Sequence, residues 1–511
     1  MTAPSQTSLQ KSVPESDSAG AACWAKRLVT LGFVLYAAFA PHSIAGAEIA
    51  LALVVIGWLI HTQAIRRSGL RHTKLDLPIC VFAIWTIASS LLSEEPASSI
   101  PKLQSVCVLF LFYITQAVVT KRTAVLLVCI MILSGVAGTL YSVYDLARGR
   151  GVIVESIALD SPLRRVHVET GDAIWRINNQ RVYSTADVDA AIKAASPETK
   201  VTVSLISRGE HVERPGLILN EREKQQGTPS GITGTSRIHW FRASGWTRHY
   251  ETFSEILQIL AQLALGLALA HLKNHGANLR FKLAIAASFV LALGIALTAM
   301  RTVLIAFALG GCVIILRAVR GKTRVLVVAA LILVLGFGAF VVWQTRAKDA
   351  LALRDSSVSL RLAIAKAGAS RILVHPLFGH GMDAVHRHWN EWGFPGDQML
   401  GLHSTPLQLA FDRGLPAMFF WLWIMATFWI ITAKAERRLR DSGQTNSYGV
   451  LLGATGAIAG FFASSMVNYN FGDAEVALVF WWLMGVVVVL ANEDGKRQKQ
   501  TAGQTASYEN S

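Results

Sequence analysis

Charged residues are scarce in this 511-residue chain, in which Asp, Glu, Lys and Arg make up only 16% of the residues and hydrophobic residues make up 52%. This balance excludes a purely water-soluble protein of this size. The formal net charge of +15 would suit a nucleic-acid partner, but the basic residues stand in short clusters between apolar stretches. We therefore interpret these clusters as signals of membrane topology and expect no nucleic-acid partner.

Cysteine is also rare, and no CxxC pair occurs. Four of the five cysteines lie inside apolar segments and the fifth precedes the first of these: Cys80, Cys107, Cys129, Cys312 and Cys23. A disulfide framework and a cysteine metal site are therefore not expected. The opening residues lack the basic start and the cleavage site of a signal peptide, so we predict a cytoplasmic tail at residues 1–24 and a first apolar segment that stays in the membrane.

What the chain does contain is a series of apolar runs near the ~20 residues that a membrane-spanning helix needs. They lie near 28–45, 47–62, 77–93, 103–120, 123–145, 252–271, 281–299, 302–317, 325–343, 407–433, 449–467 and 475–491. We predict a mainly α-helical membrane bundle of about twelve transmembrane helices, in groups at 25–145, 251–343 and 407–491.

The basic clusters occupy alternate connections between these runs, while the other short connections are almost free of Lys and Arg. Cytoplasmic loops carry the excess of Lys and Arg. Both termini, including a tail at 492–511, are therefore predicted to be cytoplasmic in a bacterial inner membrane. Two long segments, about 146–250 and 344–406, then face the periplasm.

Within the first long segment, residues 150–219 have the sequence pattern of a small folded domain. Alternating β-branched residues at 151–157 and 200–206 predict strands, and apolar residues at helical spacing predict a helix at 186–195. A Ser-Pro turn leads into Thr170-Gly-Asp-Ala-Ile-Trp-Arg-Ile-Asn-Asn179, and with this motif the segment resembles bacterial PDZ domains. The expected fold is thus a small α/β insertion, followed by a linker at 220–250.

PDZ domains capture an extended peptide as an added strand. The resemblance implies a groove between strand 151–157 and helix 186–195, with Gly151, Val152, Ile153 and Val154 on the strand side. A periplasmic protein partner is the functional interpretation, and an inert spacer is the alternative.

The second long segment holds the most specific motifs. They are Ser359-Leu-Arg361, Val374-His-Pro-Leu-Phe-Gly-His-Gly381, Leu402-His-Ser-Thr-Pro-Leu-Gln-Leu409 and Asp412-Arg-Gly-Leu415, joined by Gly245-Trp-Thr-Arg-His-Tyr250 and Ala299-Met-Arg301. This set closely resembles the O-antigen ligase and polymerase family. The resemblance implies transfer of a glycan from undecaprenyl diphosphate to a lipid or glycolipid acceptor such as lipid A-core, with residues 344–406 as the catalytic loop.

Such an enzyme must hold a diphosphate at the bilayer surface, and Arg gives permanently charged, bidentate contacts to phosphate oxygens. We assign Arg301 and Arg361 to this role; the alternatives are a helix-end residue at the interface and a solvated helix face. His403 is the candidate catalytic residue, because an imidazole accepts the proton of an attacking hydroxyl near neutral pH. A structural histidine is the alternative. Direct displacement of the diphosphate needs no metal and no cofactor and would invert the anomeric centre.

Further histidines admit other interpretations. His375, His380, His386 and His388, with Asp383, suggest a zinc site, but their spacing matches no closed structural set and no metal is expected. His249, Tyr250 and His380 are assigned to lining the acceptor or sugar site, with interfacial anchoring as the alternative for the first two.

Three other functions were weighed. An O-antigen or exopolysaccharide polymerase would use the same loop with a different acceptor. A membrane protease is not supported, because the sequence has neither the zinc-binding motif His-Glu-x-x-His nor the nucleophile motif Gly-x-Ser-x-Gly. A non-catalytic transporter or PDZ-bearing scaffold would be favoured by internal repeats, and no clear repeat is present.

Overall fold

The computed structural model describes residues 15–492 apart from 67, 179, 197–198, 208–209, 226, 239–240, 248, 322–323, 326–355 and 397–400. It divides into two compact units. The second unit comprises residues 137–251 and 296–299, and the first comprises the remainder of the chain. Each unit is described by itself.

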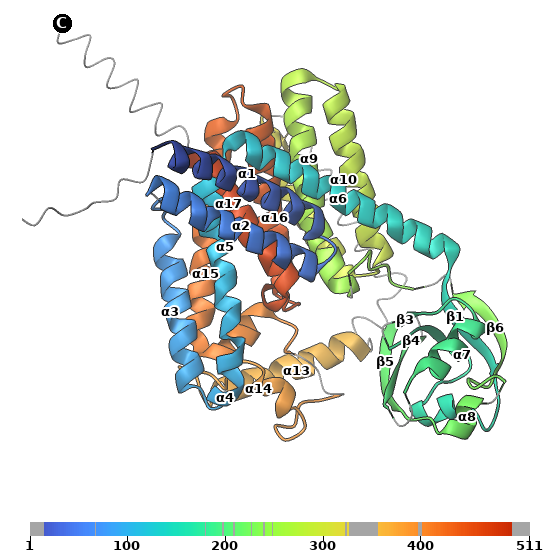
Figure 1. Cartoon of the computed structure of the whole chain (residues 1–511). Helices are drawn as coiled ribbons and strands as arrows, with labels where there is room; N and C mark the ends of the chain where they lie inside the picture. The colour runs from blue at the N-terminus through green and yellow to red at the C-terminus, as the bar shows by residue number, and fades with distance from the viewer. Residues whose placement is uncertain are drawn as a thin grey trace, which may run out of the picture. The chain divides into compact units, whose positions relative to one another are not determined.

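All regular elements of the first unit are helices in its described residues (Figure 1). Its elements are α1 (Glu15–Phe39), α2 (Ile44–Ile65), α3 (Asp76–Leu92), α4 (Pro96–Ser99), η1 (Ile100–Leu109), α5 (Phe110–Val118), α6 (Lys121–Arg148), α9 (Tyr250–His275), α10 (Leu279–Leu297), α11 (Arg301–Ala318), α13 (Ser356–Ile372), α14 (Ala384–Arg387), α15 (Thr405–Leu439), α16 (Thr445–Ser465), η3 (Asn470–Gly472) and α17 (Ala474–Asn492). The ends of α6, α9 and α10 extend into the second unit.

Ten helical segments among the described residues are long and apolar enough to cross a membrane, and α3 adds a shorter apolar helix. Each overlaps one of the predicted runs, which confirms the polytopic membrane bundle. The remaining run, 325–343, begins at the last residue described before a gap and otherwise lies outside the described residues. Two local details differ from the sequence prediction. Helix α1 begins at Glu15, inside the predicted tail, and the fourth span opens with the 3₁₀ segment η1, where Pro101 has no N–H for an α-helical hydrogen bond.

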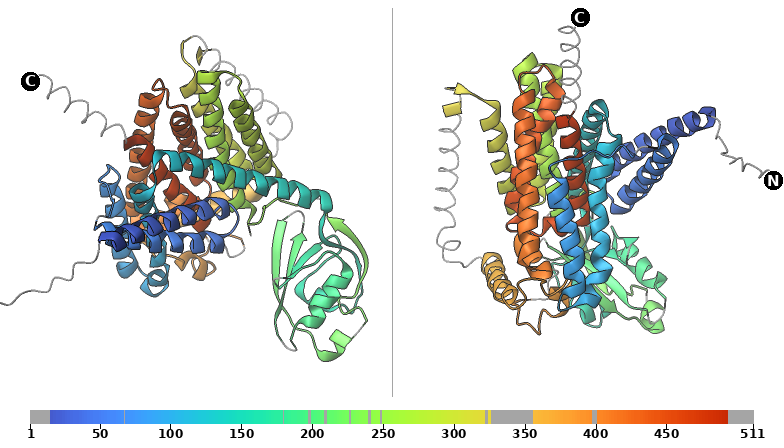
Figure 2. Two further views of the ribbon diagram at one scale, coloured as in Figure 1. Left: turned by 45° about the horizontal axis from the view of Figure 1, so that its top comes forward. Right: turned by 90° about the vertical axis from the view of Figure 1, so that its left-hand side faces the viewer.

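Small residues let the central helices of the bundle approach closely. The most buried spans are α9, α16 and α17. A Cβ atom on Gly266 of α9 would lie 2.5 Å from the carbonyl oxygen of Gly449 in α16, and one on Gly310 of α11 would lie 2.5 Å from that of Gly456. Such backbone contacts are typical of membrane helix interfaces. The pair α1 and α2 also lies side by side (Figures 1 and 2).

The second unit contains one antiparallel sheet. Its strands are β1 (Arg150–Ile157), β2 (Ala173–Ile177), β3 (Gln180–Arg181), β4 (Val201–Ser207), β5 (Glu210–Leu217) and β6 (Ile232–Ile238), in the order β5-β4-β2-β1-β6 with β3 on β2. The helical elements are η2 (Pro162–Val166), α7 (Thr185–Ala194) and α8 (Glu221–Gln225). The predicted strands and helix of 150–219 are confirmed.

Helix α7 covers one face of this sheet (Figure 2). Its apolar residues Val188 and Ile192 are buried in one cluster with Val154 and Leu205 of the strands. Ser184 caps the helix in a reciprocal capping box with Asp187. The helix and the sheet therefore share the hydrophobic core of the domain.

The predicted peptide groove on β1 is wrong. Strand β1, which includes Gly151, Val152, Ile153 and Val154, pairs with β2 on one edge and with β6 on the other. A peptide could add to β1 only if one of these edges were unpaired. The strand at this end of the sheet is β6, which comes from the segment predicted to be a linker.

Candidate active site

The turn between α16 and α17 gathers the predicted catalytic segments of the first unit. Asn468 in this turn donates through Nδ2 to the Thr302 hydroxyl at 3.3 Å, and its carbonyl accepts from the Thr405 backbone N–H at 3.1 Å. The neighbouring Val467 carbonyl accepts from Nη1 of Arg361 at 3.4 Å. Four segments that are distant in the sequence, α11, α13, the start of α15 and this turn, therefore meet at one place.

His403 lies in the turn that leads into α15, two residues before Thr405. Its backbone adopts a left-handed conformation with φ 52°, which is uncommon for a residue other than glycine. The preceding Leu402 is fixed by a hydrogen bond of 2.7 Å from its N–H to Oε1 of Gln408. Burial, and secondly the positive charge of Arg361, lower the pKa of His403 below its ordinary value. The imidazole is therefore held in its neutral form, which can accept a proton.

The two predicted diphosphate-binding residues take different positions. Arg361 is half-buried on α13 and interacts electrostatically with His403. Arg301 is exposed and is the first residue of α11, where the helix dipole is positive, next to the Thr302 that Asn468 contacts. An anion bound there would meet both the guanidinium group and the N-terminal end of the helix.

Glu255 was missed by the sequence analysis. It lies in the span α9 with an exposure of 4%, and its Oε1 accepts from Nδ2 of Asn468 and from the Ser464 hydroxyl, each at 3.1 Å. A carboxylate inside an apolar segment is costly and marks a functional position in a membrane protein. This was the signal available in the sequence. Glu255 positions Asn468, and through it the turn that Arg361 contacts.

The loop from His375 to Gly381 packs tightly on α15 near its kink at Gly414. The His380 N–H donates to the Phe411 carbonyl at 2.8 Å, and the Gly381 N–H to that of Asp412 at 3.0 Å. Both loop glycines have positive φ, at 72° for Gly379 and 111° for Gly381, a backbone conformation that glycine adopts readily. Neither has room for a side chain, because α15 and the α3–α4 turn lie against them.

His380, predicted to line the acceptor site, is instead fully buried. Its Nδ1 contacts Oε2 of Glu94 and its Nε2 contacts the Arg371 carbonyl at 2.9 Å. Nε2 of His375 lies 3.6 Å from the same Glu94 oxygen. His386 and His388 do not join this group, which is the only cluster of three or more potential metal ligands among the described residues.

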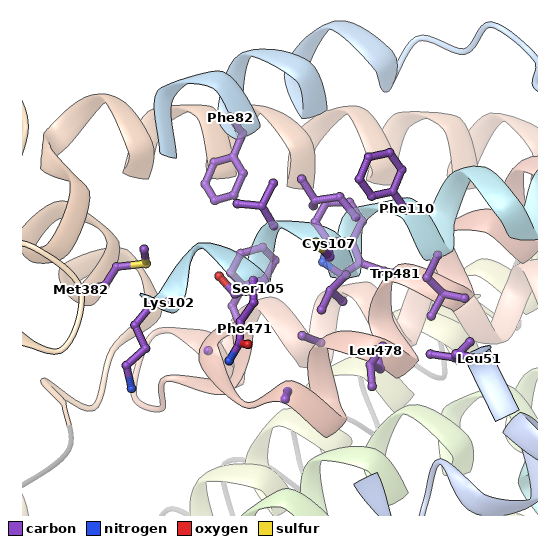
Figure 3. Close-up of a pocket in the computed structure, with 18 of the residues that line it drawn as sticks. Leu51, Phe82, Lys102, Ser105, Cys107, Phe110, Met382, Phe471, Leu478 and Trp481 are labelled. Atoms are coloured by element: carbon purple, nitrogen blue, oxygen red, sulfur yellow. The ribbon is translucent and has the colours of Figure 1, made fainter. Parts of the chain in front are cut away.

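A groove of about 580 Å³ opens beside this loop (Figure 3). Its walls are apolar side chains of α2, η1, α5 and α17, such as Leu51, Phe110, Leu478 and Trp481. At the other end lie Lys102 and Met382, with Asp383, Gln408, Asp412, Arg413 and Tyr469 among the lining residues. Gln408 and Tyr469 connect this polar end to the segments that hold His403 and Arg361.

Arg413 is the most unusual residue of the groove. Its side chain is 7% exposed, and its Nε has no hydrogen-bond partner among the residues that the structure describes. Nη2 contacts only a weak acceptor, the Met382 sulfur at 3.1 Å, and the guanidinium group lies 5.7 Å from the centre of the Phe82 ring. The neighbouring Asp412 interacts with this charge electrostatically, but no hydrogen bond joins the two side chains among the described residues. A buried charge normally also has strong hydrogen-bonding partners. Nearby, burial and the charge of Asp412 raise the pKa of Tyr469 to about 12, so that this hydroxyl stays neutral.

His249 and Tyr250 belong to the second unit. They line a hollow of about 580 Å³ together with Trp175, Arg176 and Glu213, among others. The Arg176 guanidinium bonds to Glu213 at 2.7 Å, and that of Arg242 lies 4.5 Å from the centre of the Tyr250 ring. The hollow thus combines aromatic and charged groups, which suits a polar ligand.

Comparison with known proteins matches two parts of the chain. The O-antigen ligase family model matches residues 286–422, a range that contains Arg301, Arg361 and His403, and the PDZ domain model matches residues 133–213. No curated protein matches the chain. The chain is therefore a multi-pass membrane protein that contains an O-antigen ligase domain, matched over residues 286–422, and a PDZ domain, matched over residues 133–213.

Proposed function

We propose that this protein transfers an assembled glycan from undecaprenyl diphosphate to a lipid or glycolipid acceptor, such as lipid A-core, at the periplasmic face of a bacterial inner membrane. The observation that carries the proposal is the meeting of Arg361, His403 and the start of α11 around Asn468. These residues come from the family motifs, and they combine a neutral imidazole with two guanidinium groups in one part of the first unit.

In the proposed reaction, His403 accepts the proton of the acceptor hydroxyl as its oxygen attacks the anomeric carbon of the donor glycan. The bond from that carbon to the diphosphate oxygen breaks, and undecaprenyl diphosphate leaves with the electron pair. Arg301 and Arg361 stabilise its negative charge, since charge-assisted bonds to phosphate are strong and Arg is permanently ionised. A single displacement of this kind inverts the anomeric centre, and no step in it passes through a metal.

The groove fits the lipid part of such a donor. Its apolar walls suit a polyprenyl chain, while Arg413 and Lys102 at its polar end suit a phosphate group. The incomplete set of partners around Arg413 is explained if an anion of the donor completes it. His249 and Tyr250 are proposed to contact the acceptor or the sugar.

The direct test uses purified protein with a lipid-linked glycan and candidate acceptors, without added ATP or metal. His403→Ala should lower the transfer rate by at least about 100-fold, because it removes general-base catalysis. His386→Ala is the matched control, since this histidine belongs to the same loop region but to none of the assigned contacts. Near-normal transfer by His403→Ala would remove His403 from the mechanism.

A polymerase is the second candidate, because the same groups would serve when the acceptor is another lipid-linked repeat unit. The likeness of the Gly245–Tyr250 motif and of the His403 segment to ligases favours the ligase. Surface glycan from a deletion strain separates the two. Accumulated lipid-linked polymer indicates a ligase, and single capped repeats indicate a polymerase.

A further inference from the structure

Two imidazoles are directed at one carboxylate oxygen in the first unit. Glu94 comes from the turn after α3, and His375 and His380 come from the loop after α13. The Nδ1 atom of His380 and the Nε2 atom of His375 both face Oε2 of Glu94, and one ligand atom from each of the three residues lies within 4.8 Å of the other two. A carboxylate needs only one partner for a simple ion pair. A simple ion pair therefore does not explain why a second imidazole faces the same carboxylate oxygen.

The hydrogen bonds of His380 fix which ring nitrogen carries a hydrogen. A backbone carbonyl can only accept, so Nε2, which lies 2.9 Å from the Arg371 carbonyl, must donate. In the neutral ring, Nδ1 then presents its lone pair to the Glu94 carboxylate, which is also an acceptor. Two acceptors at this distance repel unless a cation or a proton lies between them. Metal-bound histidines have this arrangement, with the other ring nitrogen donating to a carbonyl.

The backbone around the three residues is already held in place. The Glu95 N–H donates to the His380 carbonyl at 3.0 Å, and the Gly379 N–H donates to the His375 carbonyl at 3.0 Å. The His380 ring stacks on Phe411 with a centroid distance of 4.6 Å. Ligands that lie on a fixed framework lose little entropy when they bind an ion.

We propose that Glu94, His375 and His380 bind one divalent ion of the zinc class. Two imidazole nitrogens and a carboxylate oxygen are a donor set that zinc accepts at about 2.0–2.2 Å, so the three side chains would close slightly around the ion. The side chains of His375 and Glu94 are 42% and 37% exposed, which leaves a coordination position open to water. The bound ion ties the turn after α3 to the loop that packs on α15. It acts as a structural tie, separate from the transfer chemistry.

The site differs from the zinc cluster weighed from the sequence. That cluster combined His375 and His380 with His386, His388 and Asp383, all close together in the chain, whereas the proposed site keeps only the first two histidines. Here the carboxylate lies 286 positions away from His380. Spacing within the loop could not reveal it.

Equilibrium dialysis of the untagged, chelator-treated full chain against Zn²⁺, followed by elemental analysis, tests the site. We expect one ion per chain. His375→Ala and Glu94→Gln should each weaken binding by at least about tenfold, since even outer partners of a metal site contribute that much. Both residues are partly exposed, so the fold should survive, and thermal unfolding without metal checks this.

His388→Ala is the matched control. His388 also contacts carboxylates, but through different ring nitrogens, with Nε2 at 3.3 Å from Glu95 and Nδ1 at 2.6 Å from Glu391. It should bind one ion as the unaltered chain does. Cobalt should produce the absorption of a low-symmetry site in the unaltered chain and in His388→Ala only. Equal binding by all four proteins, or no binding by the unaltered chain, would overturn the proposal and leave a shared proton between His380 and Glu94.

Discussion

At the scale of single residues, His403 combines two features that rarely occur together. Its backbone is in the left-handed region, and a guanidinium group acts on its ring from α13. Conformations of this kind cost free energy and persist where the surroundings fix them, often at functional sites. Here the hydrogen bonds of Leu402 and Thr405, on either side of His403, supply that constraint.

The charge of Arg361 should be visible in the pH profile of transfer. An imidazole acts as a general base only in its neutral form, and its activity is lost as the pH falls through its pKa. Because burial and Arg361 lower the pKa of His403, the acidic limb should lie below the ordinary value of 6.5. Arg361→Gln removes one of these causes, so the pKa rises and the limb of kcat/KM should move to higher pH.

Arg361→Lys is the control for this experiment, because it keeps the positive charge while losing the bidentate geometry. It should weaken donor binding and leave the acidic limb in place. An acidic limb that does not move in Arg361→Gln would show that His403 is not the titrating base.

The sequence indicated the groups that belong to local motifs and missed those that long-range contacts bring in. His403 and Arg361 stand in recognisable stretches, whereas Glu94 and Glu255 have no motif around them. Arg413 stands in the motif Asp412-Arg-Gly-Leu415, but no role could be assigned to it from the sequence. Neither its burial nor the incomplete set of hydrogen-bonding partners around it can be seen there. Contacts between segments hundreds of residues apart depend on helix packing, which periodicity does not specify.

At the scale of elements, the kink in α15 depends on Gly414. Its φ of 82° and ψ of 166° are not helical, and a Cβ atom there would overlap the Leu377 carbonyl. Gly414→Ala should therefore lower the free energy of unfolding by about 3 kcal/mol or more, through backbone strain and displacement of the His375–Gly381 loop. Unfolding in detergent, followed by tryptophan fluorescence, measures this.

Gly443→Ala provides the comparison. Gly443 also has positive φ, at 73°, but nothing lies within 4 Å of a Cβ atom there. Only the backbone cost of about 1–2 kcal/mol should remain. An equal loss in the free energy of unfolding of the two variants would mean that the contact with Leu377 does not contribute to the effect of Gly414→Ala.

Strand β6 should prove to be part of the folded PDZ domain and not a linker. Ile232 at its start is 5% exposed within the domain core. Ile232→Ala should cost about 2–5 kcal/mol, as for other core truncations. Ile218→Ala, at a position that is 45% exposed, should stay within about 0.5 kcal/mol. Hydrogen exchange of the β1 amides in the full chain measures the loss of stability in each variant. Similar exchange rates in the two variants would contradict the assignment of β6 to the folded domain.

Apolar runs located the membrane helices, and β-branched alternation located strands β1 and β4, because each of these elements buries a continuous stripe or face. Both patterns failed for β6, where Ile232-Thr-Gly-Thr-Ser-Arg-Ile238 has apolar residues only at its ends. Pairing with β1 stabilises this strand, and that pairing is formed by tertiary structure. The peptide groove was misplaced for the same reason.

At the scale of the whole molecule, the PDZ domain and the transfer chemistry should be separable. Replacing residues 150–238 with a short Gly-Ser link removes the whole sheet, whereas removing only 150–219 would leave β6 without its partner. We expect the purified variant still to transfer glycan, because His403, Arg301 and Arg361 lie in the first unit, and the cellular product to be lost, if the domain recruits a periplasmic partner. Unchanged product in cells would count against recruitment.

The pairing of Arg150 with Ile238 across β1 and β6 has an evolutionary consequence. Paired strands lie about 5 Å apart, so the domain begins and ends at nearly one point. A cassette with such ends can enter a gene for a helical membrane protein in one in-frame event, at a single exposed connection, without requiring the flanking helices to separate. Related chains with and without this cassette can therefore share one bundle.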